Sequence, residues 1–298
     1  MVFLSHKTSV KSSINISEDT IKPVANKGLQ FEHAVMYVAT SKIINKTAQN
    51  QKDYEDAAGR WNSIPNDIKA TAERVVDSIA PSDLNARQEF YKSFKKMSGG
   101  GEEPKTDIMF KSGGTTYRCS MKWGKSYQLT SAGIDKSLSV FQKVLKKTAK
   151  DCGGGNANIE TLGYLQLILE RIAGKFENAQ GTIDQPTAKR LLGDAKRAGG
   201  LNEQLQEVLG SKKSPSAAEA YDCFKFNLTH ECMTGKMLFN GDDRAATHLL
   251  TENGIKPIDD KAVRDVMKQA GVRLALKGRG KDKVTGVRQN AIVIRYEV

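Results

Sequence analysis

A candidate reactive group of side chains lies between Glu103 and Gly124, where Asp107 precedes Ser120 and Lys122. Apolar and polar residues alternate through this stretch on both sides of a Gly113-Gly114 pair, a pattern that predicts a β-hairpin. Cross-strand neighbours on one face of a hairpin lie about 5 Å apart. The sequence therefore predicts that a carboxylate, an oxygen ligand suited to a hard cation, shares one small site with an ammonium group.

This arrangement resembles the PD-(D/E)XK nuclease superfamily. The motif of that family is an acid at the end of one strand, followed on the next strand by an acid, any residue and a lysine. The matching residues here are Glu32 on a first helix that starts near Gly28, Pro104 to Asp107, Ser120 to Lys122, and Gln128. The resemblance covers about residues 28–45 and 103–150.

The resemblance implies a Mg²⁺-dependent (or Mn²⁺-dependent) DNA nuclease, most simply an endonuclease on double-stranded or structured DNA. It implies that Asp107 is the central metal ligand, that Glu32 is a second carboxylate, and that Lys122 orients or deprotonates a metal-bound water or stabilises the charge on phosphorus. Ser120 departs from the motif because a neutral hydroxyl stands where the family has an acid. Another carboxylate must then complete the site, with Glu32 the first candidate and Glu231 the second.

The charge of the chain favours a polyanionic partner. The 298 residues include 46 basic and 34 acidic side chains, which gives a formal net charge of +12. Lysine and arginine contacts to phosphates release counterions and supply much of the affinity for nucleic acid. The expected DNA-binding residues are Trp123 and Lys125 after the hairpin, Lys143, Lys146, Lys147 and Lys150 on a basic helix face, and Arg279, Lys281 and Lys283 near the C-terminus.

The secondary-structure pattern around these residues predicts an α/β fold, a restriction-endonuclease-like core of a mixed sheet flanked by helices, with large helical insertions. We expect a flexible basic arm over 1–27 and a nuclease-like domain over 28–298, with helical insertions at about 50–100 and 155–270. Within the second insertion, Gly235 is expected to cap a helix over 217–236. Two β-like runs at 272–277 and 290–298 close the chain.

The cysteines and the absence of targeting signals predict a cytoplasmic protein, in the host cytoplasm if the gene is carried by a phage or another mobile element. Cys119, Cys152, Cys223 and Cys232 have irregular spacing, so we expect reduced thiols. The N-terminus is too short and polar for a signal peptide, and no apolar run is long enough to span a membrane. A homodimer is compatible with the resemblance.

Two alternatives remain open at this level. A non-catalytic DNA-binding protein, structural or bound to DNA ends, could keep the fold without the metal, and Ser120 favours this alternative. An RNA-binding protein would share the same basic character.

Overall fold

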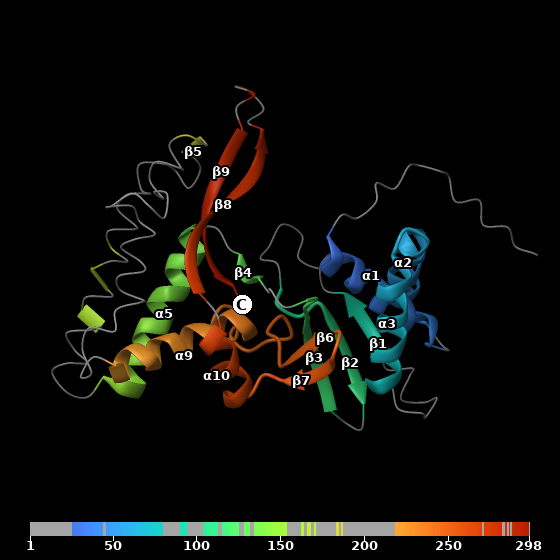
Figure 1. Cartoon of the computed structure of the whole chain (residues 1–298), viewed down its shortest axis with the longest axis horizontal. Helices are drawn as coiled ribbons and strands as arrows, with labels where there is room; N and C mark the ends of the chain where they lie inside the picture. Colours follow the sequence, from blue (N-terminus) through green and yellow to red (C-terminus); the bar gives the residue numbers. More distant parts are fainter. Residues whose placement is uncertain are drawn as a thin grey trace, which may run out of the picture.

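The computed structural model describes the chain in segments. These are residues 26–43, 46–79, 90–93, 104–112, 115–124, 128–131, 134–153, 218–269, 271–281 and 288–297, with isolated positions between 162 and 186 and at 284 and 286. Their architecture is mixed α/β (Figure 1). Among the helices of these segments, none is both long enough and apolar enough to cross a bilayer.

A five-stranded mixed sheet forms the centre of the fold. Its strands are β1 (Phe90–Ser93), β2 (Ile108–Ser112), β3 (Thr115–Met121), β6 (His248–Thr251) and β7 (Gly254–Pro257), in the order β1-β2-β3-β6-β7. Neighbouring strands are antiparallel except β3 and β6, which run parallel. The predicted hairpin around residues 113–114 is confirmed as β2 and β3.

Three helices from the N-terminal part of the chain pack on one face of this sheet. They are α1 (Lys27–Ser41), α2 (Ala48–Trp61) and α3 (Asn66–Ile79). One buried cluster joins their apolar residues, such as Phe31 and Ile68, to Ile108, Cys119 and Leu250 of the sheet. The cluster also contains Phe110 and Met121, each two residues after Ile108 or Cys119, as expected when every second side chain of a strand lies on the same face.

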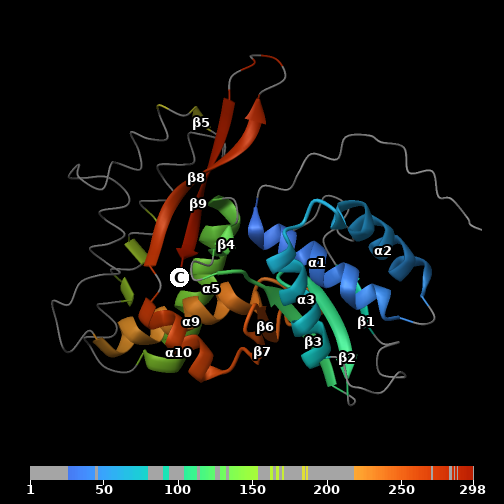
Figure 2. The ribbon, with the colours of Figure 1, turned by 45° about the vertical axis from the view of Figure 1, so that its right-hand side comes forward.

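A second group of helices comprises α5 (Ile134–Cys152), α9 (Ala218–Thr234) and α10 (Asp260–Gln269). α9 contacts both α5 and α10. The rings of Phe141 and Phe224 meet with centroids 5.9 Å apart. In Figures 1 and 2 this group and the α1–α3 group lie on opposite sides of the sheet.

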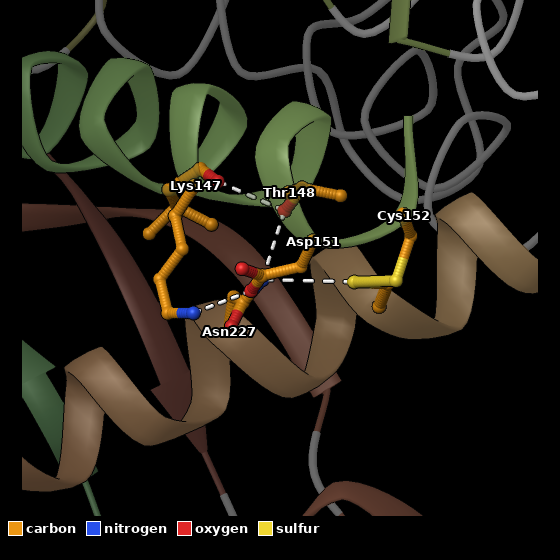
Figure 3. Close-up of a disulfide and its surroundings, with 7 residues drawn as sticks. Lys147, Thr148, Asp151, Cys152 and Asn227 are labelled. Carbon is orange, nitrogen blue, oxygen red and sulfur yellow. Dashed lines mark hydrogen bonds and ion pairs between the residues drawn. A yellow bond between two sulfur atoms is a disulfide. The ribbon is translucent and has the colours of Figure 1, made fainter. Parts of the chain in front are cut away.

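A disulfide joins Cys152 at the end of α5 to Cys223 in α9 (Figure 3). Beside it, the Asn227 amide donates to Thr148 Oγ1 and to Asp151 Oδ2, each at 3.2 Å. The expectation of reduced thiols is therefore wrong for this pair, because irregular spacing along the chain says nothing of which cysteines meet in space. Disulfides persist where the environment is oxidising, so this pair does not support a cytoplasmic setting.

A second, antiparallel sheet is built around the C-terminal strand β9 (Arg288–Glu297). β9 pairs along one edge with β4 (Gln128–Ser131) and β5 (Ile183–Asp184), and along the other with β8 (Gly271–Lys281). The two expected C-terminal β runs are confirmed as β8 and β9. They form a long hairpin that stands out from the body of the molecule (Figure 2).

The expected helical insertions are only partly present among the described residues. α2, α3, α9 and α10 fall in the ranges of about 50–100 and 155–270, but so do strands β1, β5, β6 and β7. The ranges expected to hold helical insertions therefore also contain short strands. None of these strands is longer than four residues, which is too short for a period of two to be told from a helical period. Of the predicted arm at 1–27, residues 1–25 lie outside the described residues, and Asn26 and Lys27 belong to the start of α1.

Candidate functional site

The β2–β3 register brings the acid and the lysine of the hairpin to one face of the sheet. Ile108 pairs with Cys119, and the ladder continues as the Asp107 N–H donates to the Cys119 carbonyl at 2.8 Å. Asp107 therefore lies opposite Ser120, two residues before Lys122. Because strand residues two apart share a face, the three residues lie on the face opposite the α1–α3 core.

Hydrogen bonds to the backbone of Met121 and between Lys122 and Ser120 hold these residues at the end of β3. The Met121 N–H donates to Asp107 Oδ2 at 2.7 Å. The Lys122 ammonium donates to Ser120 Oγ at 2.9 Å and to the Met121 carbonyl at 2.8 Å. The Lys122 N–H donates to the Leu250 carbonyl of β6 at 2.9 Å, which fixes the end of β3 against its parallel neighbour. Asp107 Oδ1 has no hydrogen-bond partner among the described residues.

Lys105 is a second lysine at this site, and the sequence reasoning missed it. Burial lowers the pKa of Lys105 to about 8, and the charge of Lys122 acts in the same direction. The charges of Cys232, Asp107 and Glu231 act the other way and raise the pKa of Lys105. The signal that could have found Lys105 is its spacing, because it stands two residues before Asp107.

The turn after α9 holds Lys105 in place. The Lys105 N–H donates to the Arg244 carbonyl at 2.9 Å. Gly235, with φ of 64°, follows the last residue of α9, so the predicted cap is confirmed. A Cβ at this glycine would lie 2.8 Å from Lys105 Cγ and 2.9 Å from a ring carbon of Phe239. The turn thus packs closely on the aliphatic part of Lys105.

Glu231 lies at the same place but uses its carboxylate within the turn. Glu231 is 2% exposed. Its two carboxylate oxygens accept hydrogen bonds from the Met237 N–H at 2.7 Å and the Leu238 N–H at 2.8 Å. Burial raises the pKa of Glu231, while these hydrogen bonds, Lys105 and Lys143 oppose that rise. The contacts support a role for Glu231 in fixing the turn beside Lys105, and its predicted role as a metal ligand remains a prediction.

The first helix reaches the site through its aromatic residue. Phe31 is fully buried, and its ring lies 5.0 Å from that of Trp123 at an angle of 51°. Glu32 follows Phe31, and Trp123 follows Lys122, so this turn of α1 lies beside the end of β3. Glu32 is half-buried there. Trp123 packs against the apolar core, which accounts for its position without a nucleic-acid contact.

The segment after Lys122 is anchored at both of its described ends. Glu252 Oε2 accepts from the Gly124 N–H at 3.2 Å, a contact with no signal in the sequence. Gln128 begins β4 and pairs with Glu297 of β9.

The predicted DNA contacts fall in two places. Lys143, Lys146, Lys147 and Lys150 are all exposed on α5. Of these, Lys143 donates to the Met237 carbonyl at 3.0 Å and Lys147 forms an ion pair with Asp151. Arg279 and Lys281 belong to β8. Lys125 and Lys283 lie outside the described residues.

Within the described segments, no group of three or more histidine, cysteine or acidic side chains is placed to hold a metal ion. Comparisons of the chain with protein-family models, with curated proteins and with solved structures find no match.

Proposed function

We propose that this chain is a Mg²⁺-dependent or Mn²⁺-dependent DNA endonuclease with a restriction-endonuclease-like core. The observation that carries the proposal is the cluster of Asp107, Ser120 and Lys122 on one sheet face, with Lys105 beside it. A mixed sheet with helices on both faces is the arrangement that the family resemblance implies. The net charge of +12 supports a polyanionic substrate.

The donor set of this cluster fits Mg²⁺. The oxygens available are those of the Asp107 carboxylate, the Ser120 hydroxyl and the Met121 carbonyl. Glu32, on a helix that packs on the other face of the sheet, stays the second carboxylate that the resemblance implies. Mg²⁺ prefers hard oxygen ligands, keeps several waters, and is commonly bound through one or two protein carboxylates together with substrate phosphate. A site of this kind needs no cluster of three acidic side chains. When bound, the ion would polarise the phosphodiester and lower the pKa of a coordinated water.

The lysines supply the complementary charge. Lys122 already donates to two oxygens of the cluster, so its ammonium is positioned to hold an incoming water or a phosphate oxygen. A second cation at Lys105 adds to the positive potential where negative charge develops on phosphorus. In a site shielded from water such fixed charges stabilise a transition state more strongly than they would in bulk solvent.

A non-catalytic DNA-binding protein is the second candidate, and two observations favour it. Ser120 is neutral, and no three metal-ligating side chains gather within the described segments. One aspartate beside two lysines gives a positive site even without metal, which suits simple phosphate binding.

Plasmid nicking separates the two candidates. The purified protein is incubated with supercoiled DNA and Mg²⁺ or Mn²⁺, with EDTA as the metal-free control. The nuclease proposal expects metal-dependent nicking that Asp107→Asn abolishes and that Lys122→Met lowers by about 100-fold to 1000-fold, the usual effect of removing one group that stabilises a transition state.

Matched substitutions on α10 control for the change in charge. Asp265→Asn and Lys268→Met alter exposed residues of the same types and should nick at the wild-type rate. DNA binding without nicking under either ion supports the non-catalytic binder instead. A preference for RNA over DNA in the same binding assay supports an RNA-binding protein.

A further inference from the structure

The β8–β9 hairpin is the most extended feature of the described chain. β8 has 11 residues, which at roughly 3.3 Å per residue gives a rod about 36 Å long. Figures 1 and 2 show its foot beside α5 and β4 and its distal half extending beyond α5 and the five-stranded sheet. Its length is close to one turn of duplex DNA, about 34–36 Å.

The composition of the hairpin changes along its length. Near its foot, Leu274 pairs with Ile294 and Leu276 with Ile292. Toward the tip β8 carries the basic residues Lys277, Arg279 and Lys281 and no acidic residue.

The register near the tip brings basic positions of both strands to the same end of the hairpin. Lys281 is the register partner of Arg288, and the register shifts between Gly278 and Gly280, where Arg279 lies. A concentration of basic positions favours an anionic partner at the distal half of the hairpin.

The foot of the hairpin lies close to the proposed active site along the chain. β4 pairs with the end of β9, and Gln128 of β4 is six residues after Lys122. Six residues span at most about 20 Å. β9 also contacts α5, the helix that bears the exposed lysines 143, 146, 147 and 150.

We infer that the β8–β9 hairpin is an arm that lies along double-stranded DNA and contacts its phosphates about one helical turn from its foot. The inference rests on the proposed function, because it takes DNA as the substrate. A duplex is the partner that fits, since one helical turn of about 34–36 Å matches the length of the hairpin, whereas a flexible single strand has no fixed repeat of this length. Among the described residues β8 pairs only with β9, so backbone N–H groups on its outer edge can donate to phosphate oxygens as well.

Protection of an edge strand is the competing explanation for these charges, because lysines on an exposed edge discourage pairing between molecules. The test compares the wild type with Lys277→Gln/Arg279→Gln/Lys281→Gln. The matched control, Lys52→Gln/Lys256→Gln/Lys261→Gln, removes the same charge at exposed positions on α2, β7 and α10. Binding to a 30-bp duplex and to a single strand of equal length is measured in EDTA across a salt series.

The inference expects the hairpin variant to lower the slope of log K against log salt for the duplex by about 2.7, at about 0.9 per phosphate contact. The slope for the single strand should change less, and the control should keep the wild-type slope. The hydroxyl-radical footprint should shorten by about one turn, roughly 10 bp.

The inference is overturned if the hairpin variant keeps the wild-type slope of log K against log salt for the duplex. This holds whether or not the variant self-associates in size-exclusion chromatography. An equal change for the single strand, or for the control, overturns it as well. Because these measurements exclude metal and hydrolysis, they fail or succeed independently of the nicking assay. A hairpin-dependent binder that never nicks DNA refutes only the nuclease, and a nuclease insensitive to the hairpin refutes only the arm.

Discussion

Removing the disulfide between Cys152 and Cys223 should lower the free energy of unfolding by about 4 kcal/mol. The cross-link joins residues 71 apart in the sequence. It therefore restricts the unfolded chain far more than the folded one, in which α5 and α9 already pack together. The variant that tests this is Cys152→Ser/Cys223→Ser.

The size of the effect is set by the length of the closed loop. In the chain-entropy model a cross-link lowers the conformational entropy of the unfolded state by about 2.1 + 1.5R ln n cal/mol/K, where n is the number of residues in the closed loop. For this loop the loss is about 15 cal/mol/K, which corresponds to about 4 kcal/mol at 25 °C. The hydrogen bonds from Asn227 to Thr148 and Asp151 remain in the variant. The loss should therefore be close to the entropic value.

Urea unfolding followed by tryptophan fluorescence measures the difference. Wild-type protein treated with a reductant should unfold like the double variant, and the variant should not respond to the reductant, which separates the cross-link from any effect of the serines. Thiol titration of the unfolded, unreduced protein should find the two free cysteines, Cys119 and Cys232. Four titratable thiols, or identical unfolding curves with and without reductant, would contradict the presence of a stabilising cross-link.

Two further predictions concern the residues packed beneath the site. Lys105→Met should raise the free energy of unfolding at pH 7 by up to about 3 kcal/mol, since a pKa depressed from 10.5 to about 8 costs about 1.4 kcal/mol per unit. Between about pH 8 and pH 10.5 the folded wild type releases the Lys105 proton before the unfolded chain does, so the stability of the wild type rises with pH. The difference in Tm between wild type and variant should therefore close over this range. A difference that stays constant contradicts the burial of the Lys105 ammonium. Gly235→Ala should cost about 2 kcal/mol or more in urea unfolding, because its φ of 64° disfavours a side chain and its Cβ would crowd Lys105 and Phe239; a neutral result would show that the turn adjusts freely.

The β2–β3 hairpin is the part of the fold that the sequence predicts best, because its signals are local. Alternation around Gly113-Gly114 predicts two antiparallel strands, and the structure contains them. In this register Asp107 lies opposite Ser120, two residues before Lys122. A shift of two keeps every side chain on its face, so the predicted grouping of acid and lysine does not depend on it.

What escaped prediction depends on contacts between distant parts of the chain. Strands β1 and β6 are four residues each and take their identity from the neighbours they pair with. The pairing of Cys152 with Cys223 has no local signal, since four cysteines allow three connectivities. The environment of Lys105 depends on the turn that follows α9, more than a hundred residues later in the sequence.

The parallel pairing of β3 with β6 has a consequence for biosynthesis. Arg118 and Thr247 are in contact although they are 129 residues apart. A ribosome must therefore complete most of the polypeptide before β3 finds this neighbour, and until then the nascent chain exposes an unsatisfied strand edge. Late closure of this kind slows folding and makes the incomplete product a natural client for chaperones.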